Sequence, residues 1–314
     1  PTPQPPLLSG LVGSEMCIRD SITDLYSANI SSKNGGSVAS FVLHNYALND
    51  SERVELIDHN NINNLMVGFR STDGEDISLA SGWVSDNEYD INVYDNETTV
   101  TFKKTVNNKQ ITKALTFYPD KYIIDVSVDL SAIQPWVSQG VSTVRWSGGL
   151  PLTEPNKSDE NTYYEAMVFQ GDETYSPKPK DLAQARLERM DYPSDWVAIR
   201  TKYFISALVP KKQAPGSEVL ALEENGNKSF DVGLFFKVDR PFSCSLYIGP
   251  LEYGRIKKLG ENLDRTMNFG WAFIRPISKA VHWFLLILHN YIPNYGFVLI
   301  VFSVFIKILV YPLT

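Results

Sequence analysis

The sequence predicts a mainly β protein, in which a large antiparallel β-sandwich is followed by helices at the C-terminus. Segments that alternate apolar and polar residues recur from about residue 25 to residue 250, and turn signals rich in Asn and Gly separate them. From Pro250 onward the alternation gives way to long apolar segments with helical spacing. Many strands spread over about two hundred residues are typical of a large antiparallel sandwich.

The composition bounds the class of protein. The 314 residues include 29 Lys or Arg and 36 Asp or Glu, which gives a net charge of −7, and 43% of the residues are apolar. This apolar content is too high for a disordered tail, and the acidic balance argues against a nucleic-acid partner. Two cysteines cannot build a disulfide scaffold, and four scattered histidines leave little for a metal site. The sequence therefore predicts no cofactor and no metal.

Residues 1–24 are expected to be a linker. Pro1 to Ser9 contains four prolines and no periodicity. Val12 to Ser21 fits neither a linker nor a strand and resembles translated adapter sequence, so we expect it to be non-native, and Cys17 within it carries no argument. No signal-peptide pattern opens the chain, so we expect the chain to be a fragment.

Residues 25–250 are expected to form the sandwich. Within this region, residues 181–190 are the one segment with a plausible helical pattern, and Cys244 is expected to be a half-buried strand residue. The clearest strand patterns lie within residues 38–43, 98–103, 111–117, 122–130, 196–209 and 230–238.

Two helices are predicted next. Residues 251–262 have the spacing of a short helix, and residues 271–291 are strongly apolar with their polar side chains on one side of a helical wheel. The second pattern is typical of a helix that lies in a membrane interface, with its tryptophans near the headgroups. The alternative is an amphipathic helix buried against the sandwich. The residues expected to define the interfacial helix are Trp271, Phe273, Arg275, Lys279 and Trp283.

A membrane-spanning helix is predicted at the end of the chain. Pro293 to Gly296 breaks the preceding helix, and Phe297 to Leu313 then contains Lys307 as its only charge. An apolar segment of this length is just long enough to cross a bilayer. A buried core helix is the alternative, although core helices that are apolar on all sides are rarely this long.

Lys307 is the residue expected to carry function. At 1.5 Å per helical residue it would lie roughly 16 Å beyond Gly296, near the middle of a ~30 Å hydrocarbon layer. An ammonium group at that depth costs about 2.5–3.5 kcal/mol on insertion scales. We therefore expect Lys307 to face a hydrated cavity built with other helices. The alternative is a lysine that snorkels from a single-pass anchor.

The end of the chain resembles a known family. Residues 294–314 resemble the first core helix of the YidC/Oxa membrane insertases, which has Asn-Trp/Tyr-Gly near its outer end and a basic residue at mid-helix. The same helix ends in Tyr-Pro-Leu-Thr, which here is Tyr311, Pro312, Leu313 and Thr314. Three further segments resemble the bacterial YidC periplasmic region in the same order and spacing, so that the resemblance covers roughly residues 25–314. They are residues 196–210, 246–250 and 269–278.

The resemblance implies a domain organisation. Residues 25–250 would be a periplasmic β-supersandwich related in shape to mutarotase-like domains, and residues 251–292 a helical region with the interfacial helix. Residues 293–314 would be the first core transmembrane helix, truncated here. The family also has an N-terminal anchor and further core helices, which we expect to be encoded on either side of this chain. The full-length protein would be a multi-pass protein of the bacterial inner membrane, with residues 25–292 in the periplasm.

The resemblance also implies a function. Lys307 occupies the position of a basic residue, commonly Arg, in a hydrophilic groove that receives polar parts of incoming membrane proteins. Lysine keeps the charge but lacks the planar fork of arginine. The implied protein is an insertase and chaperone, not an enzyme, that acts alone or with the Sec translocon. Its partners would be nascent integral membrane proteins, the lipid bilayer and, in the second case, Sec translocon subunits.

Two other hypotheses remain open from the residues. The first is a membrane-tethered carbohydrate-binding or carbohydrate-active sandwich, which as an enzyme would need an acid–base pair. Its candidate residues are Asp86, Glu88, Asp90 and Glu165, with His44 and His59 as weaker ones. The second is a binding module whose exposed aromatic clusters would contact a partner chain. Those clusters would be Trp136, Trp146 and Tyr163–Tyr164.

Overall fold

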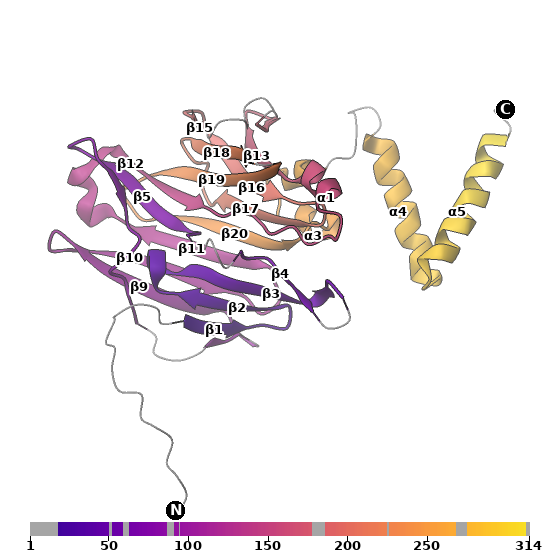
Figure 1. The fold of residues 1–314 in the computed structure, drawn as a ribbon, viewed down its shortest axis with the longest axis horizontal. Coiled ribbons are helices and arrows are strands. Elements are labelled where there is room, and N and C mark those ends of the chain that lie inside the picture. Colours follow the sequence, from indigo (N-terminus) through magenta and orange to yellow (C-terminus); the bar gives the residue numbers. More distant parts are fainter. Residues whose placement is uncertain are drawn as a thin grey trace, which may run out of the picture. The chain divides into compact units, whose positions relative to one another are not determined.

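The computed structural model describes eight stretches of the chain, and it divides the chain into two compact units. We call residues 1–266 the β unit and residues 267–314 the helical unit, and each is described by itself (Figure 1). The described residues are 18–49, 52–58, 63–86, 91–93, 95–177, 186–224, 226–267 and 275–311.

Three sheets make up the described part of the β unit. They have five, nine and six strands, and every strand pair is antiparallel except β1 with β8. The five-stranded sheet has the order β4 (Arg53–Glu55), β3 (Ser37–Ala47), β2 (Tyr26–Ser31), β1 (Ile18–Ile22), β8 (Ile91–Asn92). The mainly β prediction is thereby confirmed.

The two larger sheets combine strands from distant parts of the chain. The nine-stranded sheet has the order β14 (Glu173–Tyr175), β13 (Glu165–Gln170), β16 (Ser194–Arg200), β17 (Phe204–Pro210), β20 (Phe242–Pro250), β11 (Ile123–Asp129), β10 (Lys109–Phe117), β9 (Thr98–Val106), β7 (Val84–Ser85). The six-stranded sheet has the order β15 (Arg186–Met190), β18 (Ser217–Glu224), β19 (Asn227–Lys237), β12 (Val137–Trp146), β5 (Met66–Ser71), β6 (Asp76–Ser78).

One continuous hydrophobic core lies between the sheets. Strands β13, β16 and β17 of the nine-stranded sheet contact β18 and β19 of the six-stranded sheet. Trp196 of β16 is fully buried, its ring stacks on Phe169 at 5.4 Å, and its indole N–H donates to the carbonyl of Glu261, just before η3 (Leu263–Thr266), at 2.9 Å. A buried indole needs such an acceptor, because an unpaired buried N–H is costly.

The described helices are short in the β unit and longer in the helical unit. The bounds are η1 (Lys33–Gly35), η2 (Ser131–Trp136), α1 (Lys157–Tyr163), α3 (Tyr253–Lys258), η3 (Leu263–Thr266), α4 (Arg275–Tyr291) and α5 (Tyr295–Val310). The helix predicted at 251–262 is present as α3, and it ends before Gly260, whose φ of 76° is left-handed.

The helix predicted at residues 181–190 is wrong over its described part. Arg186–Met190 forms the edge strand β15, which pairs antiparallel with β18, Leu187 lying opposite Leu220. The residues of β15 are good helix formers, but pairing with an available sheet edge outweighs their weak intrinsic preference.

A tight turn beside Tyr164 gives a stability prediction. Gly149 has a φ of 61°, and a Cβ atom at this position would overlap the hydroxyl oxygen of Tyr164. That hydroxyl accepts a hydrogen bond from the amide of Leu150 at 3.2 Å, and the carbonyl of Gly149 accepts one from the indole of Trp146 at 3.0 Å. The turn therefore requires glycine for both its conformation and its space.

We expect Gly149→Ala to lower the free energy of unfolding of the β unit by about 3 kcal/mol. This figure combines the cost of the left-handed backbone conformation for alanine with the cost of the overlap between its Cβ atom and Tyr164. Gly171→Ala is the matched control, because Gly171 has a φ of 55° but no atom lies within 4 Å of the place that its Cβ would take. The control should lose only about 1 kcal/mol. Equal losses for the two variants in urea unfolding would show that the contact with Tyr164 is irrelevant.

Candidate functional site

The helical unit is a pair of helices joined by a tight connection. Helix α4 ends at Tyr291 and α5 begins at Tyr295, so the break predicted at residues 293–296 is present. The side-chain oxygen of Asn294 caps α5 by accepting from the amide of Gly296 at 2.8 Å. The two helices contact each other through Phe284, whose ring lies 4.6 Å from that of Phe305.

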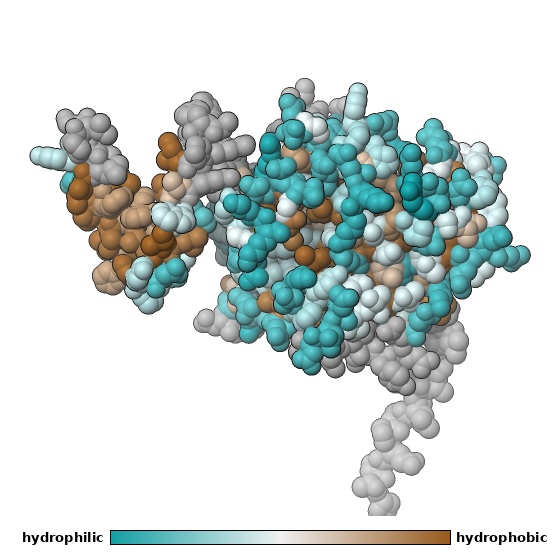
Figure 2. Space-filling model, turned by 180° about the vertical axis from the view of Figure 1, so that it is seen from behind, coloured by the Kyte–Doolittle hydropathy of each residue, from teal (hydrophilic) through white to brown (hydrophobic). Residues whose placement is uncertain are grey.

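This helix pair exposes much apolar surface. Most of the exposed large apolar side chains in the described part of the chain belong to α4, α5 and their ends. Figure 2 shows the apolar colour gathered on these two helices, whereas hydrophilic residues cover most of the visible face of the β unit. An apolar surface of this kind marks a contact with lipid or with another protein. Its members include Ile277, Trp283, Phe297, Ile300, Val304 and Ile308.

Lys307 lies on α5, one turn before the end of this helix. It is exposed, it is the single charged residue of α5, and its backbone carbonyl accepts from the amide of Tyr311. Its apolar neighbour on the same helical face, Val304, is 55% exposed. The arrangement places one cation on an otherwise apolar helix.

The other predicted site residues are divided between α4, the end of α5 and residues that the structure does not describe. Trp283 lies in the middle of α4 and is 64% exposed, and Tyr311 caps α5 and is exposed. Arg275 is the first residue of α4, and Lys279 lies one turn further along this helix. The remaining members lie outside the described residues, namely Trp271, Phe273, Pro312, Leu313 and Thr314.

Among the helices that the structure describes, none combines the length and the apolar character needed for a membrane crossing. The span predicted at 296–313 extends past Tyr311 into residues outside the description.

The carboxylates considered for an enzyme do not come together. Asp86 follows β7 at one edge of the nine-stranded sheet and pairs with Lys103 at 2.8 Å. Glu165 starts β13, near the opposite edge of the same sheet, and its carboxylate is held by Arg200 at 2.7 Å. Glu88 and Asp90 lie outside the described residues. No acid–base pair forms from the described candidates.

Most of the weaker candidate residues for an enzyme or a binding module are buried or hydrogen-bonded within the β unit. His44 contacts the hydroxyl of Ser27 at 2.7 Å, and His59 lies outside the description. Trp146 and Tyr164 are buried, so the prediction of exposed aromatic clusters is wrong for them, whereas Tyr163 is exposed. Cys244 lies in strand β20 as predicted, but it is buried, so the prediction that it is half-buried is wrong. Within the described ranges, no group of three His, Cys, Asp or Glu side chains is placed to hold a metal ion.

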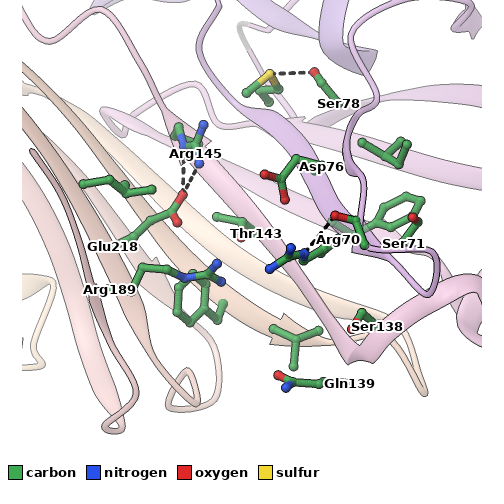
Figure 3. A pocket seen from close by; sticks show the side chains of 18 of the residues that line it. Arg70, Ser71, Asp76, Ser78, Ser138, Gln139, Thr143, Arg145, Arg189 and Glu218 are labelled. Carbon is green, nitrogen blue, oxygen red and sulfur yellow. Dashed lines mark hydrogen bonds and ion pairs between the residues drawn. The ribbon is translucent and has the colours of Figure 1, made fainter. Parts of the chain in front are cut away.

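Sequence reasoning missed a cleft on the β unit. The cleft has a volume of about 830 Å³ and lies over the face of the six-stranded sheet that points away from the core (Figure 3). Strand alternation places its residues: in β12, Val144 and Trp146 are buried, whereas Thr143 and Arg145 line the cleft. The sequence signal is the alternation at the end of β12, where Thr143 and Arg145 are polar and Val144 and Trp146 are apolar, and it does not reveal which strands lie beside β12.

Comparisons with known proteins define the class of protein. The family model of the YidC periplasmic domain matches residues 22–284. The match covers most of the chain, including nearly all of the β unit and the first part of α4. The chain belongs to the family of proteins that contain the YidC periplasmic domain.

Particular relatives extend the match. The chain is 28% identical over 303 residues to the membrane protein insertase YidC of Prosthecochloris aestuarii, which covers 92% of this chain and 52% of the relative. It is 27% identical over 325 residues to the membrane protein insertase YidC of Chlorobaculum tepidum, covering 96% of this chain and 53% of the relative. The chain spans about half the length of the curated relatives it matches.

Solved structures resemble the chain less closely than these relatives do. A galactose mutarotase related enzyme from Lactobacillus acidophilus has a TM-score of 0.48 and 10% identity, covering 74% of this chain and 97% of that chain. A galactose mutarotase-like protein from Lactobacillus casei has a TM-score of 0.45. No function follows from a likeness at this level.

Proposed function

We propose that this chain is the periplasmic domain and the first membrane-embedded part of a membrane protein insertase and chaperone of the bacterial inner membrane. The observation that carries the proposal is the family match over residues 22–284, which the insertase relatives extend over 92% of the chain. The β unit would lie in the periplasm, and the helical unit would contact the bilayer.

The chemistry of the helical unit supports this proposal. Helices α4 and α5 expose apolar side chains that lipid would cover. Lys307 adds one charge to this apolar surface, and a charge in a bilayer needs water or a partner. Hydration drawn to Lys307 would lower the cost of moving a polar segment of a nascent membrane protein into the membrane. No bond is made or broken, so the proposed protein is not an enzyme.

The proposed partners follow from this role. Nascent integral membrane proteins are the clients, and the bilayer is the medium in which they are received. An acidic client tail would be attracted to Lys307 more strongly than a neutral one. Sec translocon subunits are a further proposed partner, which would extend the client range to proteins with long translocated segments.

A carbohydrate-active enzyme is the weaker alternative. Its described carboxylates, Asp86 and Glu165, belong near opposite edges of one sheet and are each paired with a cation. A pair of acids that act across one sugar bond must lie within about 10 Å of each other.

The proposed function is tested in bacteria depleted of their own insertase. We expect the intact gene that encodes this chain to restore insertion of a single-span client with a short translocated tail, measured by protease protection of the tail. An empty vector is the control. If the protein accumulates in the membrane and the client tail stays exposed to the cytoplasm, the proposal is wrong.

A further inference from the structure

We propose that the cleft on the six-stranded sheet binds a small hydroxyl-rich molecule that carries a carboxylate or phosphate group, held between Arg70 and Arg189. This proposal concerns the β unit alone and does not depend on the insertase function. It follows from how the cationic side chains of the cleft are paired.

The floor of the cleft contains one closed ion pair. Arg145 and Glu218 come from β12 and β18, with β19 between them. Residue 233 of β19 lies between the two in register, and it is glycine; a Cβ there would come within 3.0 Å of the Glu218 side chain. The missing side chain lets Arg145 reach over β19, where its Nε donates to Glu218 Oε1 at 2.8 Å.

Glu218 is therefore already neutralised. Its side chain is only 4% exposed, and both contacting nitrogens of Arg145 converge on one carboxylate oxygen. Arg189 lies directly opposite Glu218 in the β15–β18 pairing, yet it makes no ion pair with it. Instead, its guanidinium lies over the ring of Phe235, 4.8 Å from the ring centroid.

Arg70 approaches from the other side of the cleft. Its Nε donates to the carbonyl of Gly74 at 3.0 Å, which fixes the side chain and leaves its terminal nitrogens for other partners. In Figure 3, Arg70 and Arg189 point toward each other across the cleft, with Thr143 between them. Among the described residues, no carboxylate lies within ion-pair distance of either guanidinium.

Two facing cations without a shared counter-ion are an arrangement that a bound oxyanion stabilises. Each guanidinium presents a planar fork that matches a carboxylate or a phosphate. Asp76 and Asp191 also line the cleft, and they would oppose the anion. Their presence disfavours a highly charged ligand and favours one with a single acidic group.

The rest of the lining indicates the remainder of the ligand. Ser138, Gln139 and Thr143 contribute hydroxyl and amide groups; in Figure 3 Thr143 lies near the two arginines, and Ser138 and Gln139 lie farther along the cleft. Such groups bind ligand hydroxyls by hydrogen bonds. A volume of about 830 Å³ is in the usual range for small-molecule sites. A sugar acid or a sugar phosphate has both features.

Calorimetric titration of the 314-residue chain, in a detergent without a sugar headgroup, tests the proposal. The probes are glucuronate, glucose 6-phosphate, neutral glucose and inorganic phosphate, of which the first two distinguish a carboxylate from a phosphate ligand. We expect saturable binding of at least one of these two acids, at least tenfold tighter than glucose and inorganic phosphate.

Four variants assign the binding to the cleft. Arg70→Gln and Arg189→Gln should each weaken binding at least tenfold, whereas Arg240→Gln, at an exposed arginine outside the cleft, should leave it unchanged. Asp76→Asn should tighten binding because it removes a negative charge that opposes the bound anion. A misfolded variant would bind more weakly, so misfolding cannot explain tighter binding. Absence of saturable binding, equal binding of glucose, or unchanged affinity in both cleft variants would overturn the proposal.

Discussion

Lys307→Glu, introduced into the intact gene, is expected to reduce insertion of a client with an acidic translocated tail at least tenfold. The substitution replaces the single charge of α5 by one of opposite sign, so that attraction of the tail becomes repulsion. A change of about 1.4 kcal/mol is enough for a tenfold effect, and reversing a charge pair at low dielectric exceeds that amount. The measurement is the fraction of protease-protected client after a short pulse of synthesis.

Three controls make this result specific. Lys307→Arg should keep at least half of the activity because the charge is retained, and a client with a neutral tail should be affected less than the acidic one. Val301→Glu adds an acid at an exposed position of α5 that is neither three nor four residues from Lys307, so it reports on general disturbance of the helix. Wild-type insertion of the acidic client by Lys307→Glu would contradict the electrostatic role.

Lys113→Met is expected to lower the free energy of unfolding of the β unit by about 3 kcal/mol at pH 7, because buried acceptors lose their donor. Lys113 lies in β10, fully buried, and its ammonium donates to the carbonyls of Leu65 at 2.6 Å and Asn34 at 2.9 Å. A weaker contact reaches Gly36. Methionine fills the same space but leaves these acceptors unpaired, which costs about 1–3 kcal/mol each before relaxation.

The same lysine should make stability depend on pH. Burial lowers the pKa of Lys113 to about 7, although the three carbonyl acceptors favour the ammonium form. Between pH 7 and pH 9 the unfolded chain then holds a proton that the folded chain lacks, so stability rises with pH, by at most about 1.4 kcal/mol per pH unit. Below pH 7 both states are protonated and the dependence ends.

The measurement is urea unfolding of the wild type and of Lys113→Met at pH 7, 8 and 9, which stays below the ordinary pKa of tyrosine. The free energy of unfolding of the wild type should rise from pH 7 to pH 9, whereas that of Lys113→Met should lack this rise. Lys109→Met, at an exposed position of the same strand, is the control. Parallel pH profiles for all three proteins would show that Lys113 is already charged when folded.

The sequence could predict what depends on local pattern. Alternation along residues 122–130 and 230–238 predicted strands that the structure contains as β11 and β19. The apolar segments after Pro250 predicted helices, and Pro293 to Gly296 predicted the break between α4 and α5. These features are set by neighbouring residues, so one sequence is sufficient to find them.

What depends on strand order could not be predicted. The cleft joins β5, β12, β19, β18 and β15, which are adjacent in the sheet although all but the hairpin of β18 and β19 are far apart in the chain. No spacing in the sequence places Arg70 opposite Arg189. The same limit explains the error at Arg186–Met190, where the partner strand β18 decides the conformation. Buried Lys113 was missed because its acceptors come from turns that only the fold brings together.

Cross-linking to a client tests the central proposal most directly. A photoreactive amino acid at position 304, one turn before Lys307, keeps the lysine and samples the same face of α5. The matched position is Val84 in the β unit, which is 69% exposed. During synthesis of a single-span client, adducts between position 304 and the client's polar tail are expected, with none from position 84. Adducts from position 84 with none from position 304 would contradict the account.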